Sequence, residues 1–155
     1  MVARAAPNGI KLTDGYRTLF AFRADPDVAL WEKIVKPPGL DGGEAIDTTT
    51  MHNDVMRTFA LRALKTLTES NFQAGFDPKC YDQLIALINI NDIITIHFPD
   101  ESELDFWGGL RTFDTADMEE GTFPMATCAI TPTNQDNTGA EVLPNYKPAA
   151  SGSPD

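Results

Sequence analysis

The chain has 155 residues, close to the roughly 150 that make one globular domain, and 42% of them are hydrophobic. Lys and Arg total 12 against 23 Asp and Glu, which gives a formal net charge of −11 and a sequence pI near 4.4. This balance argues against a protein that holds duplex DNA by neutralising its phosphates. Two cysteines are too few for a disulfide scaffold, and no apolar stretch reaches the ~18 residues of a membrane helix. We therefore expect a soluble, acidic, single-domain protein, and the first residues contain no apolar signal core.

The negative charge is concentrated in the second half of the chain. Residues 1–79 carry ten basic and ten acidic side chains, whereas residues 80–155 carry thirteen acids against only Arg111 and Lys147. One interpretation is a solvated surface that keeps the protein soluble. The other is a surface that repels a polyanion and avoids retaining it.

In chain order, residues 1–14 show no periodicity and are interpreted as an N-terminal arm. Two alternating runs follow, at residues 16–24 and 28–36, and the turn residues Asp25-Pro26-Asp27 separate them. Two short strands around such a turn predict a β-hairpin.

Residues 37–53 are predicted to be a long loop, since two prolines and three glycines fall between positions 36 and 45. Loops of this length in compact domains are usually functional or disordered. In residues 54–67 the apolar positions follow helical spacing, which predicts one or two helical turns. Those positions are Val55, Met56, Phe59, Ala60, Ala63, Leu64 and Leu67.

Residues 66–76 alternate again and predict a strand with one polar face. A helix is expected next, because Asp77 is a good N-cap and Pro78 suits the first helical position. Its apolar stripe would consist of Tyr81, Leu84, Ile85 and Ile88, and Asn89 or Asn91 would end it.

Three further strands are predicted at residues 92–98, 104–114 and 122–131, the last two joined by an acidic turn. Gly108-Gly109 indicates a bulge or a close backbone approach. Residues 133–155 are rich in Pro, Gly and Ser and are expected to be a flexible C-terminal tail. The sum is a mainly β domain over residues 15–132, an antiparallel β-sandwich or barrel with one flanking α-helix.

Side chains that could carry chemistry are few and scattered. His52 and His97 lie in no nucleophile or metal motif, and Cys80 and Cys128 lack the spacing of a zinc site. Cys80 falls in the first turn of the predicted helix, where the dipole could lower its pKa, but a small core residue is the simpler interpretation. The acidic groups do not follow the pattern of a calcium loop. We therefore expect no enzyme activity, no metal and no cofactor.

Several short motifs occur in an order that resembles a known family. They are Pro38-Gly39…Gly43…Ile46-Asp47-Thr48-Thr49, then Gly75-Phe76-Asp77-Pro78, then Gln83-Leu84, and finally Phe106-Trp107-Gly108-Gly109. Over residues 14–132 this arrangement resembles the major tail protein, or tail tube protein, of long non-contractile-tailed bacteriophages.

The resemblance implies a structural virion protein that forms hexameric rings. In that family, neighbouring sheets join into a continuous barrel, and the rings stack into a tail tube that conducts genomic DNA during ejection. The implied partners are other copies of the chain, the tape measure protein, and the tail terminator and distal tail proteins. DNA would pass without specific binding, no membrane is involved, and the tube would be assembled in the bacterial host cytoplasm.

Two sets of candidate residues follow from the loop and the charge pattern. The long loop is expected to reach the next ring or subunit. DNA carries one charge per ~1.7 Å of axis, so a basic channel would retain it and an acidic one would let it slide. The candidate ring-stacking residues are Pro38, Gly39, Leu40, Asp41, Gly43 and Ile46, and the candidate acidic lumen or rim residues are Glu101, Glu103, Asp105, Asp117, Glu119 and Glu120.

Two alternatives stay open at this level. One is the inner-tube protein of a contractile or type VI secretion-like system. The other is a small β-sandwich enzyme or binding module, which would stay monomeric and show a concave site with convergent polar groups.

Overall fold

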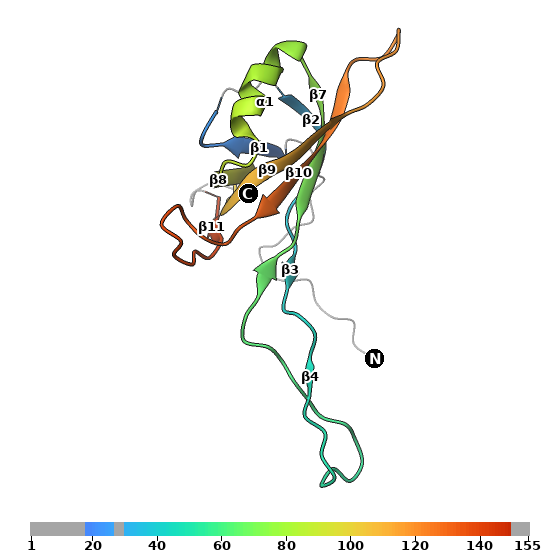
Figure 1. The fold of residues 1–155 in the computed structure, drawn as a ribbon, viewed down its shortest axis with the longest axis vertical. Coiled ribbons are helices and arrows are strands. Elements are labelled where there is room, and N and C mark those ends of the chain that lie inside the picture. The colour runs from blue at the N-terminus through green and yellow to red at the C-terminus, as the bar shows by residue number, and fades with distance from the viewer. Residues whose placement is uncertain (1–17, 27–29, 150–155) are drawn as a thin grey trace.

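The computed structural model describes residues 18–26 and 30–149, so the predicted N-terminal arm at residues 1–14 lies outside the described part. The main element is a seven-stranded antiparallel sheet in the order β1-β8-β9-β10-β7-β2, with β11 beside β9 (Figure 1). The expectation of a mainly β chain with one flanking α-helix is confirmed, but the described strands do not close into a barrel. The strands are β1 (Leu19–Phe22), β2 (Leu30–Lys36), β7 (Ser70–Phe76), β8 (Asp92–His97), β9 (Glu103–Thr115), β10 (Met125–Pro132) and β11 (Asn145–Lys147).

The predicted hairpin between the first two strands is wrong. β1 pairs with β8 and β2 pairs with β7, so the two lie at opposite edges of the sheet. Turn residues between two strands do not require those strands to pair with each other. Here both strands pair with segments that are distant in the sequence. The edges still approach each other, since the Phe20 backbone N–H donates to Glu32 Oε1 at 3.4 Å.

The sheet curls, and its concave side holds the core. Phe20 on β1 and Phe72 on β7 lie four strands apart in the sheet order, yet their ring centroids are 4.7 Å apart. Phe106, Ile94 and Ile130 fill the interior between them and are almost fully buried. For β7, alternation therefore predicted correctly which face of the strand is buried.

A short helical segment packs against this core. It consists of η1 (Pro78–Cys80) continued by α1 (Tyr81–Leu87). The Asp77 carboxylate accepts a hydrogen bond from the Lys79 N–H at 3.0 Å, as expected for an N-cap. The helix is shorter than predicted and buries Leu84 and Leu87, whereas Ile85 of the predicted stripe is 73% exposed.

At Gly108 and Gly109 in β9, neighbouring backbone segments come too close for a side chain, as the sequence indicated. A Cβ on Gly109 would lie 2.9 Å from the Ile90 carbonyl oxygen, and one on Gly108 would lie 2.8 Å from the Thr131 carbonyl oxygen. The register also shifts in this stretch, between Ala129 and Ile130 of β10.

Residues 54–67 form no helix, so the predicted one or two helical turns are wrong. They contain β5 (Phe59–Ala60) and β6 (Thr66–Leu67), which pair with β4 (Ile46–Asp47) and β3 (Leu40–Asp41). Helical spacing stabilises a helix only when its apolar stripe has a core to cover. Here the chain runs away from the sheet, so the stripe has nothing to cover.

Residues 133–149, predicted as part of a flexible tail, are instead ordered against the sheet. β11 pairs with the first residues of β9, on the side that β10 leaves uncovered. Asp136 caps a tight turn by accepting from Thr138 and Ala140 backbone N–H groups, and Lys147 pairs with Asp105 at 2.8 Å. The first residues of β9 have backbone groups that β10 does not pair, and β11 forms hydrogen bonds with them although the composition of the segment predicted a flexible tail. Residues 150–155 lie outside the described part.

Candidate assembly surfaces

Residues 37–69, which we call the arm, connect β2 to β7 and project far from the sheet as two extended segments (Figure 1). Two ladders of two residue pairs each hold the segments together. At the base, the Gly39 N–H donates to Thr68 Oγ1 and the Thr68 N–H donates to the Gly39 carbonyl oxygen, both at 2.8 Å. The two segments of the arm are therefore hydrogen-bonded to each other at its base.

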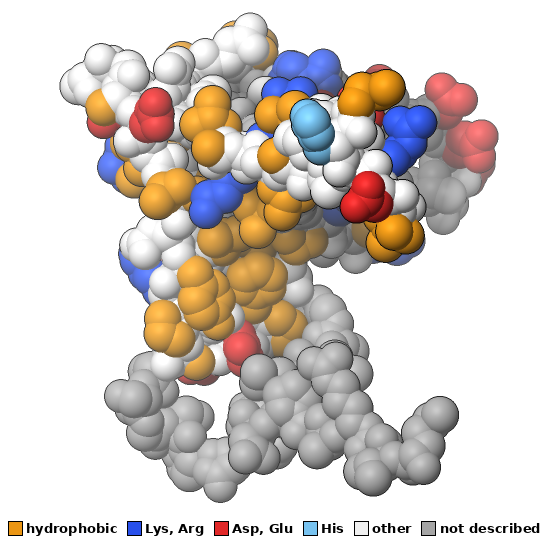
Figure 2. Space-filling view, turned by 90° about the horizontal axis from the view of Figure 1, so that it is seen from below, with side chains coloured by type: hydrophobic (Ala, Val, Ile, Leu, Met, Phe, Trp, Pro, Cys, Tyr) orange, Lys and Arg blue, Asp and Glu red, His pale blue; other side chains and the backbone are white. Residues whose placement is uncertain are grey.

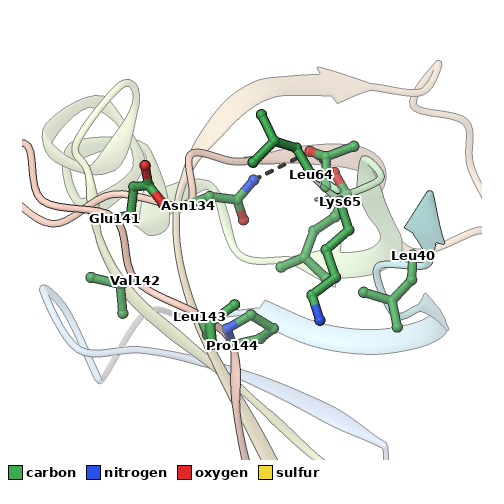
Figure 3. A pocket seen from close by; sticks show the side chains of 10 residues that line it. Leu40, Leu64, Lys65, Asn134, Glu141, Val142, Leu143 and Pro144 are labelled. Atoms are coloured by element: carbon green, nitrogen blue, oxygen red, sulfur yellow. Dashed lines mark hydrogen bonds between the residues drawn. The ribbon is translucent and has the colours of Figure 1, made fainter. Parts of the chain in front are cut away.

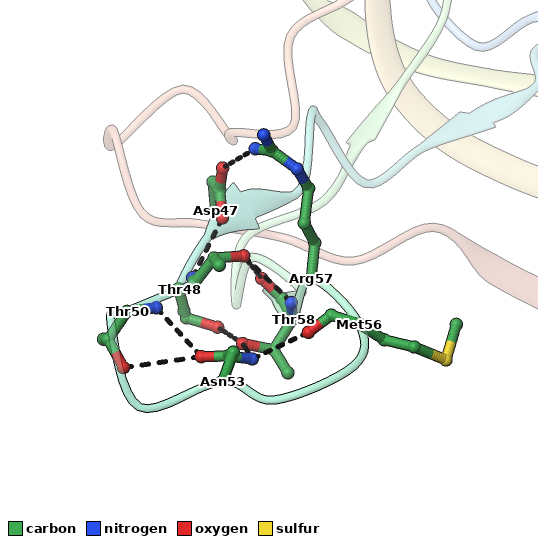
Figure 4. A network of polar contacts seen from close by, with 8 residues as sticks. Asp47, Thr48, Thr50, Asn53, Met56, Arg57 and Thr58 are labelled. Atoms are coloured by element: carbon green, nitrogen blue, oxygen red, sulfur yellow. Dashed lines mark hydrogen bonds and ion pairs between the residues drawn. The ribbon is translucent and has the colours of Figure 1, made fainter.

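The end of the arm, residues 47–58, is organised by its own polar side chains (Figure 4). We call it the arm tip. Asn53 bridges the turn, because its Oδ1 accepts from the Thr50 N–H and its Nδ2 donates to the Met56 carbonyl oxygen, each at 2.9 Å. The Thr48 and Thr58 hydroxyls meet at 3.0 Å across the two segments. This network fixes the backbone of the tip without a hydrophobic core.

Asp47 anchors the start of the same network. Its Oδ1 accepts from the Thr49 N–H at 2.9 Å, and its Oδ2 lies 3.5 Å from Arg57 Nη1. The hydrogen bonds from Thr49 hold the pKa of the Asp47 carboxyl below its ordinary value.

Most large apolar side chains of the arm are exposed, and Leu67 at its base is the one that joins the core. A contiguous exposed apolar surface on a protein usually marks an interaction site. In the view from below, orange apolar side chains gather over the middle of the molecule (Figure 2). The exposed fractions are 100% for Met51, 91% for Val55, 88% for Leu61, 82% for Leu64, 76% for Met56 and 74% for Leu40.

A groove of about 710 Å³ lies at the base of the arm and is lined mostly by apolar side chains (Figure 3). We call it the arm groove. One wall comes from Leu40 and residues 64–67 of the arm, and the other from Asn134 and residues 141–144. Asn134 Nδ2 donates to Thr66 Oγ1 at 3.2 Å and ties the two walls together.

All six candidate stacking residues lie in the first segment of the arm, between its base and β4. Gly43 is at a left-handed φ of 80°, which favours glycine, and its N–H donates to Asp41 Oδ1 at 2.8 Å. Leu40 lines the arm groove, and Ile46 is 47% exposed. Pro38 and Gly39 form the base.

The sequence patterns did not predict that residues 54–69 return to the sheet as the second segment of the arm. They also did not predict that Asn134 and residues 141–144 form a wall of the groove. Leu61 and Leu64 were assigned to a helix, and Leu143 to a flexible tail. A signal for the reversal was present, since Asn53-Asp54 are turn residues after a threonine-rich run. No local pattern shows that residues 64 and 143 share a groove.

The six candidate acidic residues fall into two groups at opposite ends of β9. Glu101, Glu103 and Asp105 lie at its start, and Asp117, Glu119 and Glu120 lie in the β9–β10 connection. The ten residues of β9 that follow Asp105 lie between the groups and, at about 3.4 Å per residue, separate them by roughly 35 Å. They do not form one continuous acidic surface on a single subunit.

The first acidic group takes part in contacts that hold the sheet and β11. Glu103 Oε1 lies 3.2 Å from His97 Nδ1, and Asp105 accepts from the Thr95 hydroxyl at 2.7 Å and pairs with Lys147. Burial alone would raise the pKa of Asp105, but Lys147 and Thr95 more than offset it, so its pKa lies below the ordinary value. Glu101, at a φ of 69°, is exposed in the turn before β9.

The two thiols are core residues. Cys80 and Cys128 are fully buried, and burial raises the pKa of both, that of Cys128 to about 12. The predicted core role of Cys80 fits this environment, which disfavours a thiolate.

Within residues 18–26 and 30–149, no group of three or more His, Cys, Asp and Glu side chains is placed to hold a metal ion. In the same part of the chain, no helix has the length and hydropathy to cross a membrane.

Comparison with known proteins identifies a similar fold among solved structures. No protein-family model matches the sequence, and no curated protein matches it. Among solved structures, the fold is similar to a chain in the cryo-EM structure of the anti-feeding prophage baseplate, 6-fold symmetrised, with a TM-score of 0.61. The match covers 90% of this chain and 98% of that one at 11% sequence identity, so it shows a shared fold.

Proposed function

We propose that this chain is a structural subunit of a phage-like particle and that its copies assemble through the arm. The observation that carries the proposal is the arm itself. Its residues are hydrogen-bonded to one another at the base and at the tip, yet it exposes apolar side chains that its own sheet does not cover. Supporting it, the fold is shared over almost the whole chain with a component of a prophage baseplate.

In its specific form, the proposal is a tail tube subunit of a long non-contractile-tailed phage. Copies would form hexameric rings that stack along a tape measure protein, between tail terminator and distal tail proteins, and DNA would pass without specific binding. The 6-fold symmetry of the baseplate that contains the similar chain supports the ring number. We assign no catalytic reaction to the chain.

A second candidate is an inner-tube or baseplate component of a contractile or secretion-like particle, which the prophage baseplate match favours. The two differ in growth along the axis. Rings of a tube subunit stack on one another through a heterologous contact that repeats along the axis, whereas a baseplate subunit forms a single ring layer.

The test is negative-stain microscopy and light scattering of the purified full chain over a wide range of concentration. A structural subunit is expected to form rings at high concentration, and a tube subunit to extend them into tubes. Rings that never stack would favour the baseplate position. A protein that stays monomeric at every concentration would contradict the proposal and favour a binding module.

The acidic-channel part of the proposal has a separate test. Charge reversal at Glu101, Glu103, Glu119 and Glu120 should slow DNA ejection from assembled particles, because added positive charge retains the phosphate backbone. Unchanged ejection in all four variants would assign these residues to solubility alone.

A further inference from the structure

We propose that the arm tip of one copy docks in the arm groove of a second copy, with Met51, Val55 and Met56 as its apolar anchors. This inference rests on the proposed function and names the two surfaces that meet. Each chain would then contribute one tip and one groove to every contact.

The arm tip requires a partner to cover its apolar side chains. Met51, Val55 and Met56 are 100%, 91% and 76% exposed, and Figure 4 shows the Met56 side chain pointing away from the polar network. Methionine adapts its shape to an irregular surface, which suits a docking residue. Since the tip backbone is already fixed by Asn53 and the threonines, docking would cost little ordering entropy.

The tip cannot reach the groove of its own copy. Nine residues separate Asp41 from Thr50 along the first segment, which at about 3.3 Å per residue places the tip roughly 30 Å from the arm base. The β4–β5 ladder lies between them and keeps the arm extended (Figure 1). Any arm tip in the groove therefore comes from another molecule.

The groove has the size and lining that such a tip needs. Its volume of about 710 Å³ falls within the range of pockets that enclose several side chains. Leu40, Leu64 and Leu143 on its walls are 74%, 82% and 71% exposed, so a docked tip would cover apolar surface on both copies.

Charges on the two surfaces can pair. The tip carries Asp54 and Arg57, and the groove carries Lys65 on one wall and Glu141 on the other, all four exposed. Asp54 facing Lys65 would fix the direction in which the tip enters. Arg57 would face Glu141 by exchanging its 3.5 Å contact with Asp47 for one with the second copy. A second copy satisfies both the apolar and the charged requirements.

A contact of this kind is heterologous, since tip and groove are different surfaces. Such contacts either close into a ring or grow as an open filament. Both outcomes agree with a particle built from repeated copies.

The first experiment measures the concentration at which the full chain assembles, by light scattering, for Leu143→Asp and Met56→Asp. Each is expected to raise that concentration on the order of tenfold or more, since every tenfold corresponds to 1.4 kcal/mol. The matched control is Ile85→Asp on α1, whose side chain is 73% exposed and belongs to neither surface. Circular dichroism checks that all three variants fold.

The second experiment reverses one charge pair. Asp54→Lys and Lys65→Asp should each weaken assembly, and the double variant should restore it towards the wild-type level. Mixing the folded variants Met56→Asp and Leu143→Asp should give a complex of two copies that does not grow, because one intact tip and one intact groove remain.

The outcomes separate this inference from the proposed function. If the wild type assembles and Leu143→Asp or the charge reversals do so equally well, tip-to-groove docking is wrong and the structural role stands. A wild type that never assembles overturns both.

Discussion

The curled sheet and the arm contain similar apolar residues, and the structure treats them in opposite ways. Phe106 in β9 is 2% exposed, whereas Phe59 in β5 is 59% exposed. The sheet buries its apolar face in its own core, while the arm has only short ladders and a polar network. The sheet therefore determines whether a copy folds, whereas the arm is the exposed surface that we propose for contacts between copies.

Truncation of a matched phenylalanine in each region gives the largest expected difference. Phe106→Ala should lower the free energy of unfolding by about 3–5 kcal/mol through loss of burial and a cavity. Phe59→Ala should change it by less than about 0.5 kcal/mol. Urea denaturation of both variants measures this, and a comparable loss for Phe59→Ala would show that the arm supports the fold.

A matched glycine pair sharpens the comparison at the backbone. Gly109→Ala in β9 should cost about 1–3 kcal/mol, because the new Cβ would lie 2.9 Å from the Ile90 carbonyl oxygen. Gly42→Ala in the arm meets nothing within 4 Å and should be neutral or stabilise by up to about 1 kcal/mol. Thermal unfolding of the two variants distinguishes these outcomes, and equal costs would contradict the open environment of Gly42.

Glu32 makes the stability of the sheet depend on pH. Its burial raises the pKa of the carboxyl above the ordinary 4.5, although backbone hydrogen bonds partly offset the burial. The folded chain thus holds this proton more tightly than the unfolded chain. Its contribution is fully present below pH 4.5 and is lost as the pH rises through the higher folded pKa.

Glu32→Gln should therefore be more stable than the wild type at neutral pH and should lose that advantage at low pH, since its amide oxygen can still accept from Phe20. Urea titrations at several pH values check this. A variant that is less stable at neutral pH would show that the carboxylate charge itself stabilises the sheet edge.

The smallest effect is expected at the arm tip. The lowered pKa of Asp47 means that its contribution is present above the ordinary value of 3.8 and is lost as the pH falls through the lower folded pKa. Asp47→Asn should reduce hydrogen-exchange protection of the Thr49 amide and leave the global unfolding free energy unchanged. A change in global unfolding would mean that the tip is coupled to the core.

Several features of the sheet could be predicted because they depend on neighbouring residues. Alternation along residues 66–76 identified the buried face of a strand, and Asp77 followed by Pro78 identified the start of the helix. The close approach at Gly108-Gly109 was also indicated by sequence. Each signal reports a local preference that the core then satisfied.

The candidate site was predicted only in part. Residues 37–53 were predicted to be a long loop that reaches another copy, but the returning segment of the arm was predicted to be helical. The acidic residues were predicted to form one lumen or rim surface, but most of β9 separates them into two groups. The helical spacing that includes Val55 and Leu64 was misleading, because both side chains are exposed and no core lies beside them to stabilise a helix.

The sequence by itself determined that this is a mainly β protein with one short helix, since period-two alternation and capping residues act within a few positions. Tertiary structure alone decided that β1 and β2 stand at opposite edges, that β11 covers the end of β9, and that Leu64 and Leu143 line one groove. Alternation specifies which face of a strand is buried, but it carries no information about which strand lies beside it.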